Sequence, residues 1–240
     1  MPTEYDNIDV IGTTHESSKN STEEKMNSYY HKQEVNTVKE LLQKLYTGSF
    51  ENIIDLGCSV GTWYDDFKKL GFKEIIGIDI SEQRAEIAKK RGYNEVHVCN
   101  AYELPFNDNS KSCVISNDVL IHVLQDDDKS QIFNEVKRIL KKEGIFIFNI
   151  ANANGFGYEK DTTVKYCRFN TTKTISKLIQ DAGFKIEFIL PSYYTIPLIG
   201  AHPFVAPLFT SIIFPFVDAI LKKMNRINSA QTIYFGTKIE

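Results

Sequence analysis

The 240-residue chain is poor in the features that mark several specialised protein classes. Its four cysteines, Cys58, Cys99, Cys113 and Cys167, form no Cys-x-x-Cys pair and show no metal-ligand spacing, which argues against a disulfide scaffold or a zinc site. The net charge is −3, and without an excess of Lys and Arg there is no electrostatic basis for nucleic-acid binding. The first twenty residues lack the basic and apolar regions of a secretory signal. We therefore predict a cytoplasmic protein with reduced thiols, no metal and no nucleic-acid partner.

One segment lacks charge altogether. No Asp, Glu, Lys or Arg occurs in residues 188–217, a stretch of 30 residues, which is long enough for a membrane span of about 20 apolar residues. Five of the seven prolines lie in this stretch, however, and proline interrupts helical hydrogen bonding. A strand predicted beyond it, at residues 230–238, must also return to the same sheet. We therefore predict no transmembrane segment and interpret residues 191–229 as an insertion of short helices and proline turns.

Hydrophobic patterning predicts an α/β fold. Ser21 and Glu24 have the spacing of a capping box, and apolar residues follow at helical spacing as far as Gly48, so a helix is expected over residues 21–48. From Ile53 onward, short apolar runs alternate with amphipathic segments, as in repeated βα units around a parallel sheet. The predicted strands are 53–56, 75–79, 95–99, 113–117, 144–150, 184–190 and 230–238.

These elements predict a doubly wound, Rossmann-like, seven-stranded mixed sheet. The last strand has the pattern of an antiparallel edge strand, and the insertion lies between the last two strands. No fixed-period repeat or linker divides the chain. We expect a mobile tail over residues 1–20 and a single domain over residues 21–240.

The segment IIDLGCSVGTW, residues 53–63, carries the chemistry. A strand ends at Asp55 and Leu56, turns at Gly57, and passes Gly61 into a helix. Glycine allows the sharp turn and the close approach of a ligand, and the helix N-terminus presents free N–H groups. Asp79 ends the next strand, where a carboxylate can accept hydrogen bonds from both hydroxyls of a ribose. This arrangement predicts a nucleoside-binding half-fold.

The glycine spacing discriminates between nucleoside cofactors. A dinucleotide fingerprint, Gly-x-Gly-x-x-Gly, would place Ser59 and Thr62 at its second and third glycines, so only Gly57 fits. The segment instead resembles the first motif of class I S-adenosylmethionine-dependent methyltransferases, Asp-x-Gly-x-Gly-x-Gly, with Ser59 in place of the middle glycine. The resemblance covers roughly residues 51–150 and, more loosely, the last two strands.

The resemblance implies S-adenosyl-L-methionine as cofactor and assigns its contacts. Asp79 matches the acidic residue that holds the ribose, Ile80 the apolar neighbour of adenine, and Asn100-Ala101 the pair at the adenine amino edge. Asn117, within Ser116-Asn117-Asp118, faces the methionine moiety and the acceptor. The implied cofactor-binding residues are Asp55, Gly57, Ser59, Gly61, Asp79, Ile80, Asn100, Ala101 and Asn117.

The acceptor side is less marked by motifs. His122 follows the fourth strand, and because imidazole ordinarily titrates near neutral pH it is the predicted general base. The helix at residues 21–48 is expected to act as a lid, with Tyr29 and Tyr30 facing the acceptor. The uncharged insertion would add Tyr193, Tyr194 and His202 to an apolar acceptor pocket. The predicted activity is methyl transfer to a small, apolar or aromatic acceptor, such as a natural product, a sugar derivative or a lipid-like molecule.

Other interpretations stay open at this point. The nucleoside site also suits a non-catalytic module that senses S-adenosylmethionine or its demethylated product, and a nucleotide-dependent oxidoreductase. Residues 191–217 also suit a homodimer contact or an interfacial membrane surface. Asp118 and His122 have the i, i+4 spacing of half a metal site, but no third ligand is suggested nearby, and the acids at residues 126–128 are expected to begin the next helix.

Overall fold

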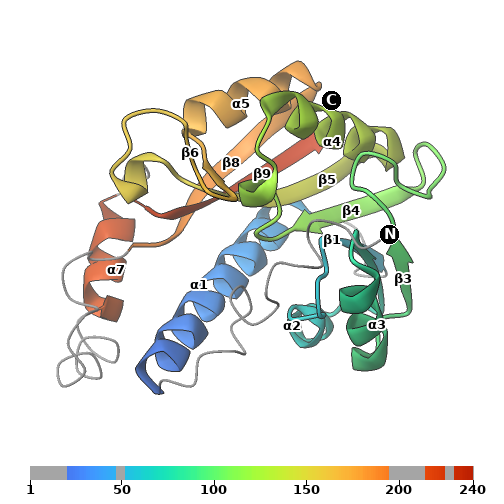
Figure 1. Cartoon of the computed structure of the whole chain (residues 1–240), viewed down its shortest axis with the longest axis horizontal. Helices are drawn as coiled ribbons and strands as arrows, with labels where there is room; N and C mark the ends of the chain where they lie inside the picture. The colour runs from blue at the N-terminus through green and yellow to red at the C-terminus, as the bar shows by residue number, and fades with distance from the viewer. Residues whose placement is uncertain (1–20, 47–51, 195–213, 225–229, 240) are drawn as a thin grey trace.

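The computed structural model describes residues 21–46, 52–194, 214–224 and 230–239. A seven-stranded sheet in the order β3-β2-β1-β4-β5-β9-β8 forms the centre of the molecule (Figure 1). All neighbouring strands in it are parallel except the pairs that β9 makes with β5 and β8. Its strands are β1 (Asn52–Leu56), β2 (Glu74–Asp79), β3 (Glu95–Val98), β4 (Lys111–Ser116), β5 (Leu140–Ala151), β8 (Phe184–Tyr193) and β9 (Thr232–Ile239).

Helices cover both faces of the sheet (Figure 1). Apolar residues of α4 and α5 pack on one face with Phe146 and Phe148 of β5. Apolar residues of α1, α2 and α3 pack on the other face with Ile145 and Ile147 of the same strand. The helices are α1 (Ser21–Leu45), α2 (Tyr64–Leu70), α3 (Glu82–Arg91), α4 (Asp126–Ile139), α5 (Thr172–Asp181) and α7 (Phe214–Lys223). The predicted fold class, a mixed seven-stranded sheet with an antiparallel last strand, is confirmed.

Local sequence signals account for several helix boundaries. The hydroxyl of Ser81 accepts a hydrogen bond from the Arg84 N–H at the start of α3, and the Thr171 hydroxyl does the same for Thr174 at the start of α5. Helix α4 begins at Asp126 with three acidic residues in its first turn, where negative charge interacts favourably with the helix dipole. These signals were readable in the sequence, and the helix start predicted at residues 126–128 is confirmed.

The position of β9 corrects one prediction. We expected the last strand at the edge of the sheet, but it lies between β5 and β8, and β8 is the edge strand. The side chains of β9 are buried on both faces, with Tyr234 in one apolar cluster and Ile233 and Phe235 in the other. Burial on both faces requires a central position, which the mixed polar and apolar sequence of this strand did not indicate.

Two shorter features also differ from the expectation. A separate antiparallel hairpin, β6 (Thr162–Val164) and β7 (Cys167–Phe169), follows β5 and was not predicted. Its strands have three residues each and are at most half-buried, so they carry almost no hydrophobic pattern. Helix α1 ends at Leu45, and its second half is part of the core, because Val38, Leu41 and Leu42 are fully buried.

Candidate functional site

A cavity of about 570 Å³ opens at the carboxyl ends of the parallel strands. Its walls come from the segments that follow β1, β2, β3 and β4. Because β4 lies beside β1 rather than beyond β3, the cavity is at the point where the strand order reverses, which is where open α/β sheets bind ligands. The predicted site residues that line it are Gly57, Ser59, Asp79, Ile80, Asn100, Ala101, Asn117 and His122.

The turn after β1 depends on Gly57. Its φ is +83°, and a Cβ there would lie 2.1 Å from Cγ2 of Val119, so no other residue fits without displacing the segment after β4. The N–H groups of Gly57 and Cys58 both donate to the Ile78 carbonyl, at 2.7 and 2.9 Å. These bonds join the turn to the end of β2. Glycine at this position therefore sets the shape of the cavity floor.

Asp79 connects the same turn to the start of α3. One carboxylate oxygen accepts a hydrogen bond from the Ser59 N–H at 2.8 Å, and the other accepts from the Ser81 N–H at 2.9 Å. Burial raises the pKa of this carboxyl, while the backbone donors at Ser81 and Ser59 act in the opposite direction. Ser59 has a φ of +49°, a strained conformation for a residue with a side chain. The Asp79 carboxylate stabilises that conformation by accepting the Ser59 N–H.

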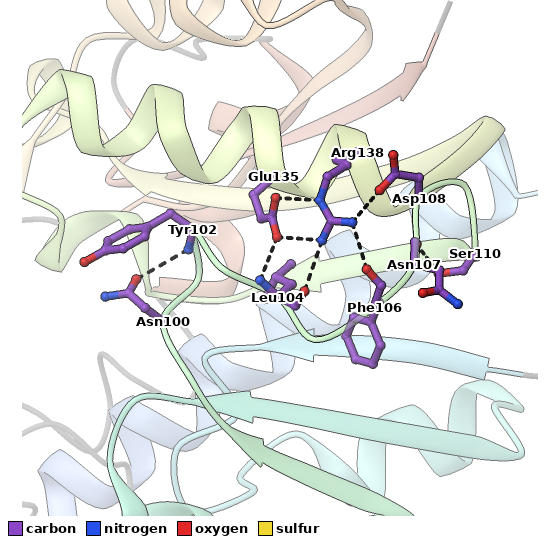
Figure 2. Close-up of polar contacts among 9 residues, drawn as sticks. All are labelled: Asn100, Tyr102, Leu104, Phe106, Asn107, Asp108, Ser110, Glu135 and Arg138. Atoms are coloured by element: carbon purple, nitrogen blue, oxygen red, sulfur yellow. Dashed lines mark hydrogen bonds and ion pairs between the residues drawn. The ribbon is translucent and has the colours of Figure 1, made fainter.

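The loop after β3 forms the next wall and is fastened to α4 (Figure 2). The Asn100 side-chain oxygen accepts the Tyr102 N–H at 3.4 Å. Further along, Glu135 accepts the Leu104 N–H, and the Arg138 guanidinium donates to the carbonyls of Leu104 and Phe106 at 3.0 and 2.8 Å. The same guanidinium pairs with Asp108 and Glu135. Arg138 thus holds a loop whose first residues, Asn100 and Ala101, line the cavity.

Replacing Arg138 with Ala should loosen that loop. The carbonyls of Leu104 and Phe106 would lose a charged donor, and we expect a loss of about 2 kcal/mol in the free energy of unfolding and about threefold weaker binding of S-adenosylhomocysteine. Chemical denaturation and calorimetry measure the two effects. Lys142→Ala, at an exposed position of β5, is the control and should change neither quantity. Unchanged stability of Arg138→Ala would contradict the anchoring role.

The segment after β4 is held by side chains of β5 and β9. Asp118 has a φ of +57°. The Asn149 side chain accepts the Asp118 N–H at 2.7 Å and donates its own N–H to the Asp118 carboxylate at 2.8 Å. The Tyr234 hydroxyl donates to the Asn117 side-chain oxygen at 2.8 Å. A left-handed aspartate fixed by two such bonds is typical of functional sites, where strain is maintained by the surrounding structure.

His122 ends the short 3₁₀ helix η2 (Leu120–His122). Its Nδ1 lies 3.3 Å from the carbonyl of Tyr166, in the turn of the β6–β7 hairpin. Since a carbonyl can only accept, this contact favours the neutral tautomer with its proton on Nδ1, which leaves Nε2 as a proton acceptor. The unpredicted hairpin therefore orients the ring that the sequence suggested as a base.

The residues predicted on the acceptor side lie outside the lining of this cavity. The Tyr29 hydroxyl donates to Asp218 of α7 at 2.9 Å, and the Tyr194 N–H donates to the same carboxylate at 3.1 Å. The rings of Tyr30 and Tyr193 stack with centroids 4.4 Å apart. The structure therefore brings these four tyrosines together around α1, α7 and the end of β8. His202 lies outside the described residues.

Two predicted cofactor residues also lie outside the lining. Asp55 is buried and accepts the Tyr93 hydroxyl at 2.5 Å. Burial raises the pKa of Asp55 to about 7, and the hydrogen bond from Tyr93 opposes this shift. Gly61, with a φ of +81°, packs against the Tyr93 ring. Asp55, Gly61 and Tyr93 thus lie together next to the turn and support it.

The comparisons with known proteins agree with this geometry. A sequence profile described as a methyltransferase domain matches residues 54–148. The uncharacterized protein MJ0638 of Methanocaldococcus jannaschii is 30% identical over 189 residues, 74% of this chain and 75% of its own. A probable S-adenosylmethionine-dependent methyltransferase of Mycolicibacterium smegmatis is 26% identical over 60% of this chain and 55% of its own. The chain belongs to the class I S-adenosylmethionine-dependent methyltransferase family.

The fold of this methyltransferase is also found among solved structures. The structure of geranyl diphosphate C-methyltransferase from Streptomyces coelicolor superposes with a TM-score of 0.62 over 94% of this chain and 87% of that one, at 17% identity. This chain matches between 42% and 75% of the full length of each of four sequence relatives. The cofactor of this enzyme is S-adenosyl-L-methionine, as the sequence resemblance implied.

The residues present suit that cofactor. Asp79 presents a carboxylate beside a turn whose backbone a ligand can approach at Gly57, and the amide nitrogen of Asn117 is buried without a hydrogen-bond partner among the described residues. An orphaned donor in a cavity wall indicates a ligand acceptor. Trp63 and Arg84, for which the sequence predicted no role, also line the cavity of the methyltransferase. Trp63 is the single tryptophan of the chain and directly follows the glycine turn, a signal that could have been used.

Within residues 21–46, 52–194, 214–224 and 230–239, no three His, Cys, Asp or Glu side chains converge on one point as metal ligands would. In the same part of the chain, no helix combines the length and apolarity that crossing a membrane requires. Helix α7 exposes Phe216 and Ile220, and Met224 directly after the helix is exposed at the same spacing of four residues. The dimer and interfacial-membrane interpretations of this region stay predictions.

Proposed function

We propose that this methyltransferase acts on a small acceptor with an apolar or aromatic body. The observation that carries the proposal is that Asp118, in the lining of the cofactor cavity, lies near Tyr193, one of the four acceptor-side tyrosines. Asp118 is close enough to Tyr193 to act on its ionisation. Aromatic side chains beside the cavity lining at Asp118 suit a compact apolar molecule better than an extended polymer.

We assign the cofactor contacts as follows. Asp79 accepts hydrogen bonds from the ribose hydroxyls, Ile80 packs against adenine, and Asn100 with Ala101 contacts the adenine edge. The turn at Gly57 and Ser59 gives the methionine moiety close access to the backbone, and Asn117 donates to it. Asp55 and Gly61 act through Tyr93 by supporting the turn. The bound cofactor supplies a methyl group already activated by its sulfonium, so the protein has mainly to orient the acceptor and exclude water.

His122 is the proposed general base of the site. The Tyr166 carbonyl fixes the ring, and Nε2 can take a proton from the acceptor. Only a few other side chains are needed, because methyl transfer requires alignment of the acceptor with the S–CH₃ bond rather than extensive acid–base chemistry. This agrees with a cavity where His122 is the one imidazole among the described lining residues.

A nucleic-acid acceptor is the main competing proposal, because some relatives are named as probable tRNA methyltransferases. The net charge of −3 provides no general attraction for phosphates. The segment at residues 188–217, which begins within β8, contains no charged residue. We therefore favour the small acceptor, and we include tRNA as a comparison in the experiment.

The proposal is tested with labelled S-adenosylmethionine and two acceptor pools, small-molecule extracts and total tRNA. We expect incorporation of label into an extractable small molecule and none into tRNA. Calorimetry with S-adenosylhomocysteine and with NADH accompanies this assay, and only the former should bind. Methylation of tRNA alone would refute the small-acceptor proposal. Binding without turnover on any acceptor would favour the sensor alternative.

A further inference from the structure

A cluster of charged side chains lies at the start of α4, next to residues 123–125, which line the cavity. The side chain of Lys129 is fully buried, and its Nζ lies 3.8 Å from Oδ1 of Asp126. The guanidinium of Arg168, on β7, approaches the same oxygen at 3.7 Å. Two cations from different elements therefore share one carboxylate oxygen, and this fastens the β6–β7 hairpin to α4.

The cluster reaches the segment that carries His122 from two sides. On one side, Nζ of Lys129 donates a hydrogen bond to the carbonyl of Val123, the residue directly after His122. On the other side, Arg168 lies two residues after Tyr166, whose carbonyl contacts Nδ1 of His122 at 3.3 Å. The orientation of the imidazole therefore depends on contacts that both cations hold in place.

The hairpin is too short to keep its position alone. Each of its strands has three residues, and a two-stranded hairpin is at best marginally stable without packing. Its turn includes Lys165 with a φ of +52°, a strained conformation that persists only where the surroundings maintain it. Arg168 donates across the hairpin to the Thr163 hydroxyl at 3.2 Å and also reaches Asp126. It is therefore a polar link between the hairpin and α4.

The burial of Lys129 is costly for the fold. Burial lowers the pKa of its ammonium group to about 8, while the charge of Asp126 acts in the opposite direction. Apolar side chains of similar volume are often as stable as buried ion pairs, or more stable. Stability alone thus gives little reason for an ammonium group here. A donor fixed on the Val123 carbonyl, in contrast, sets the path of the chain next to His122.

We propose that Lys129 and Arg168 are positioning residues for His122. Lys129 acts through the carbonyl of Val123. Arg168 acts through the carbonyl of Tyr166, and together the two cations favour the imidazole form with its proton on Nδ1. This inference rests on the proposed function, because it concerns the base of the same site. Neither cation lines the cavity, so both act through the imidazole rather than on the substrate.

The tautomer of His122 gives a test that needs no acceptor. The full chain is labelled with ¹⁵N-histidine, and long-range ¹H–¹⁵N correlation spectra at about pH 7.5, where an ordinary imidazole is mostly neutral, report which ring nitrogen carries the proton. The His122 signal is assigned by its absence in His122→Ala. We expect the Nδ1–H form to predominate in wild type. Its ratio to the Nε2–H form should fall at least threefold in Lys129→Met and in Arg168→Met, because free imidazole favours the Nε2–H form.

A matched variant controls for the loss of a surface cation. Lys173→Met, at an exposed position of α5, should leave the tautomer ratio of His122 unchanged. The affinity of Lys129→Met and Arg168→Met for S-adenosylhomocysteine should stay within twofold of wild type. An unchanged tautomer ratio in either variant overturns the role of that residue, even if its melting temperature falls.

Coupling to His122 separates positioning from a general loss of structure. Transfer of label to the small-molecule extract should be at least fivefold slower in Arg168→Met than in wild type. In the His122→Ala background the same change should have no further effect, because residues that act as a unit are not additive. Equal losses in both backgrounds would assign Arg168 to stability alone and overturn the inference.

Failure of the proposed function gives a different result. Absence of S-adenosylhomocysteine binding, or of label transfer by wild type, contradicts the function, whereas the tautomer ratio still decides whether Lys129 and Arg168 orient the ring of His122.

Discussion

Asp79→Ala is expected to weaken S-adenosylmethionine binding at least 100-fold. The variant loses the two proposed hydrogen bonds to the ribose, each worth about 1.5 kcal/mol when the acceptor is charged, and a tenfold change in affinity corresponds to about 1.4 kcal/mol. It also frees the N–H of Ser59 and that of Ser81, so the turn loses the group that holds its left-handed residue. Calorimetry with S-adenosylhomocysteine measures the loss directly.

Two control variants distinguish the ribose contact from the support of the turn. Asp79→Asn keeps one acceptor oxygen and should bind with an affinity between those of wild type and Asp79→Ala. Asp65→Ala, at an exposed position of α2, should bind normally. If Asp79→Ala bound S-adenosylhomocysteine within fivefold of wild type, the ribose assignment would be wrong, because the charged contacts would then contribute almost nothing.

His122→Ala is expected to reduce turnover about 100-fold, the lower range for losing a general base. Binding of S-adenosylhomocysteine should stay within threefold of wild type, since the ring contacts the Tyr166 carbonyl rather than the glycine turn. Single-turnover methyl transfer under saturating acceptor measures the chemical step. The prediction therefore combines a large kinetic loss with an almost unchanged affinity for the cofactor product.

A second histidine provides the matched control. His97 of β3 lies outside the cavity lining and pairs with Glu95 at 3.1 Å, so His97→Ala should leave turnover unchanged. An unchanged rate in His122→Ala would reject His122 as the base.

The sequence predicted those parts of the fold in which the local apolar pattern of a segment agrees with its burial in the folded protein. The first two strands are largely apolar and buried on both faces. A residue with a specific backbone or ligand role follows the first strand, Gly57, and ends the second, Asp79. The same locality made the cavity predictable, because parallel strands bring their carboxyl ends to one edge of the sheet.

The parts that escaped prediction depend on contacts between distant segments. Glutamate is a residue type usually found at the protein surface. Glu34 is nevertheless buried, because helix α1 packs against β8 and β9. Asp55 follows the family motif, yet its carboxylate contacts Tyr93, 38 residues away. The helical spacing of Tyr30, Glu34 and Val38 does place Glu34 on the buried stripe of α1, which was the available signal for this residue.

The ends of the insertion have a consequence for how this enzyme can change. Tyr193 and Thr232 are direct partners in the sheet, and Gln231 donates its N–H to the Tyr193 carbonyl at 3.2 Å. The chain thus leaves and re-enters the sheet at one rung, and α7 within the insertion is held by the hydrogen bonds that Asp218 accepts from Tyr29 and Tyr194. Doubling the length of such a loop costs only about 0.6 kcal/mol. If the corresponding segment of a homologue is grafted between these residues, the range of accepted substrates should change to that of the homologue. The affinity for the cofactor should stay that of this protein.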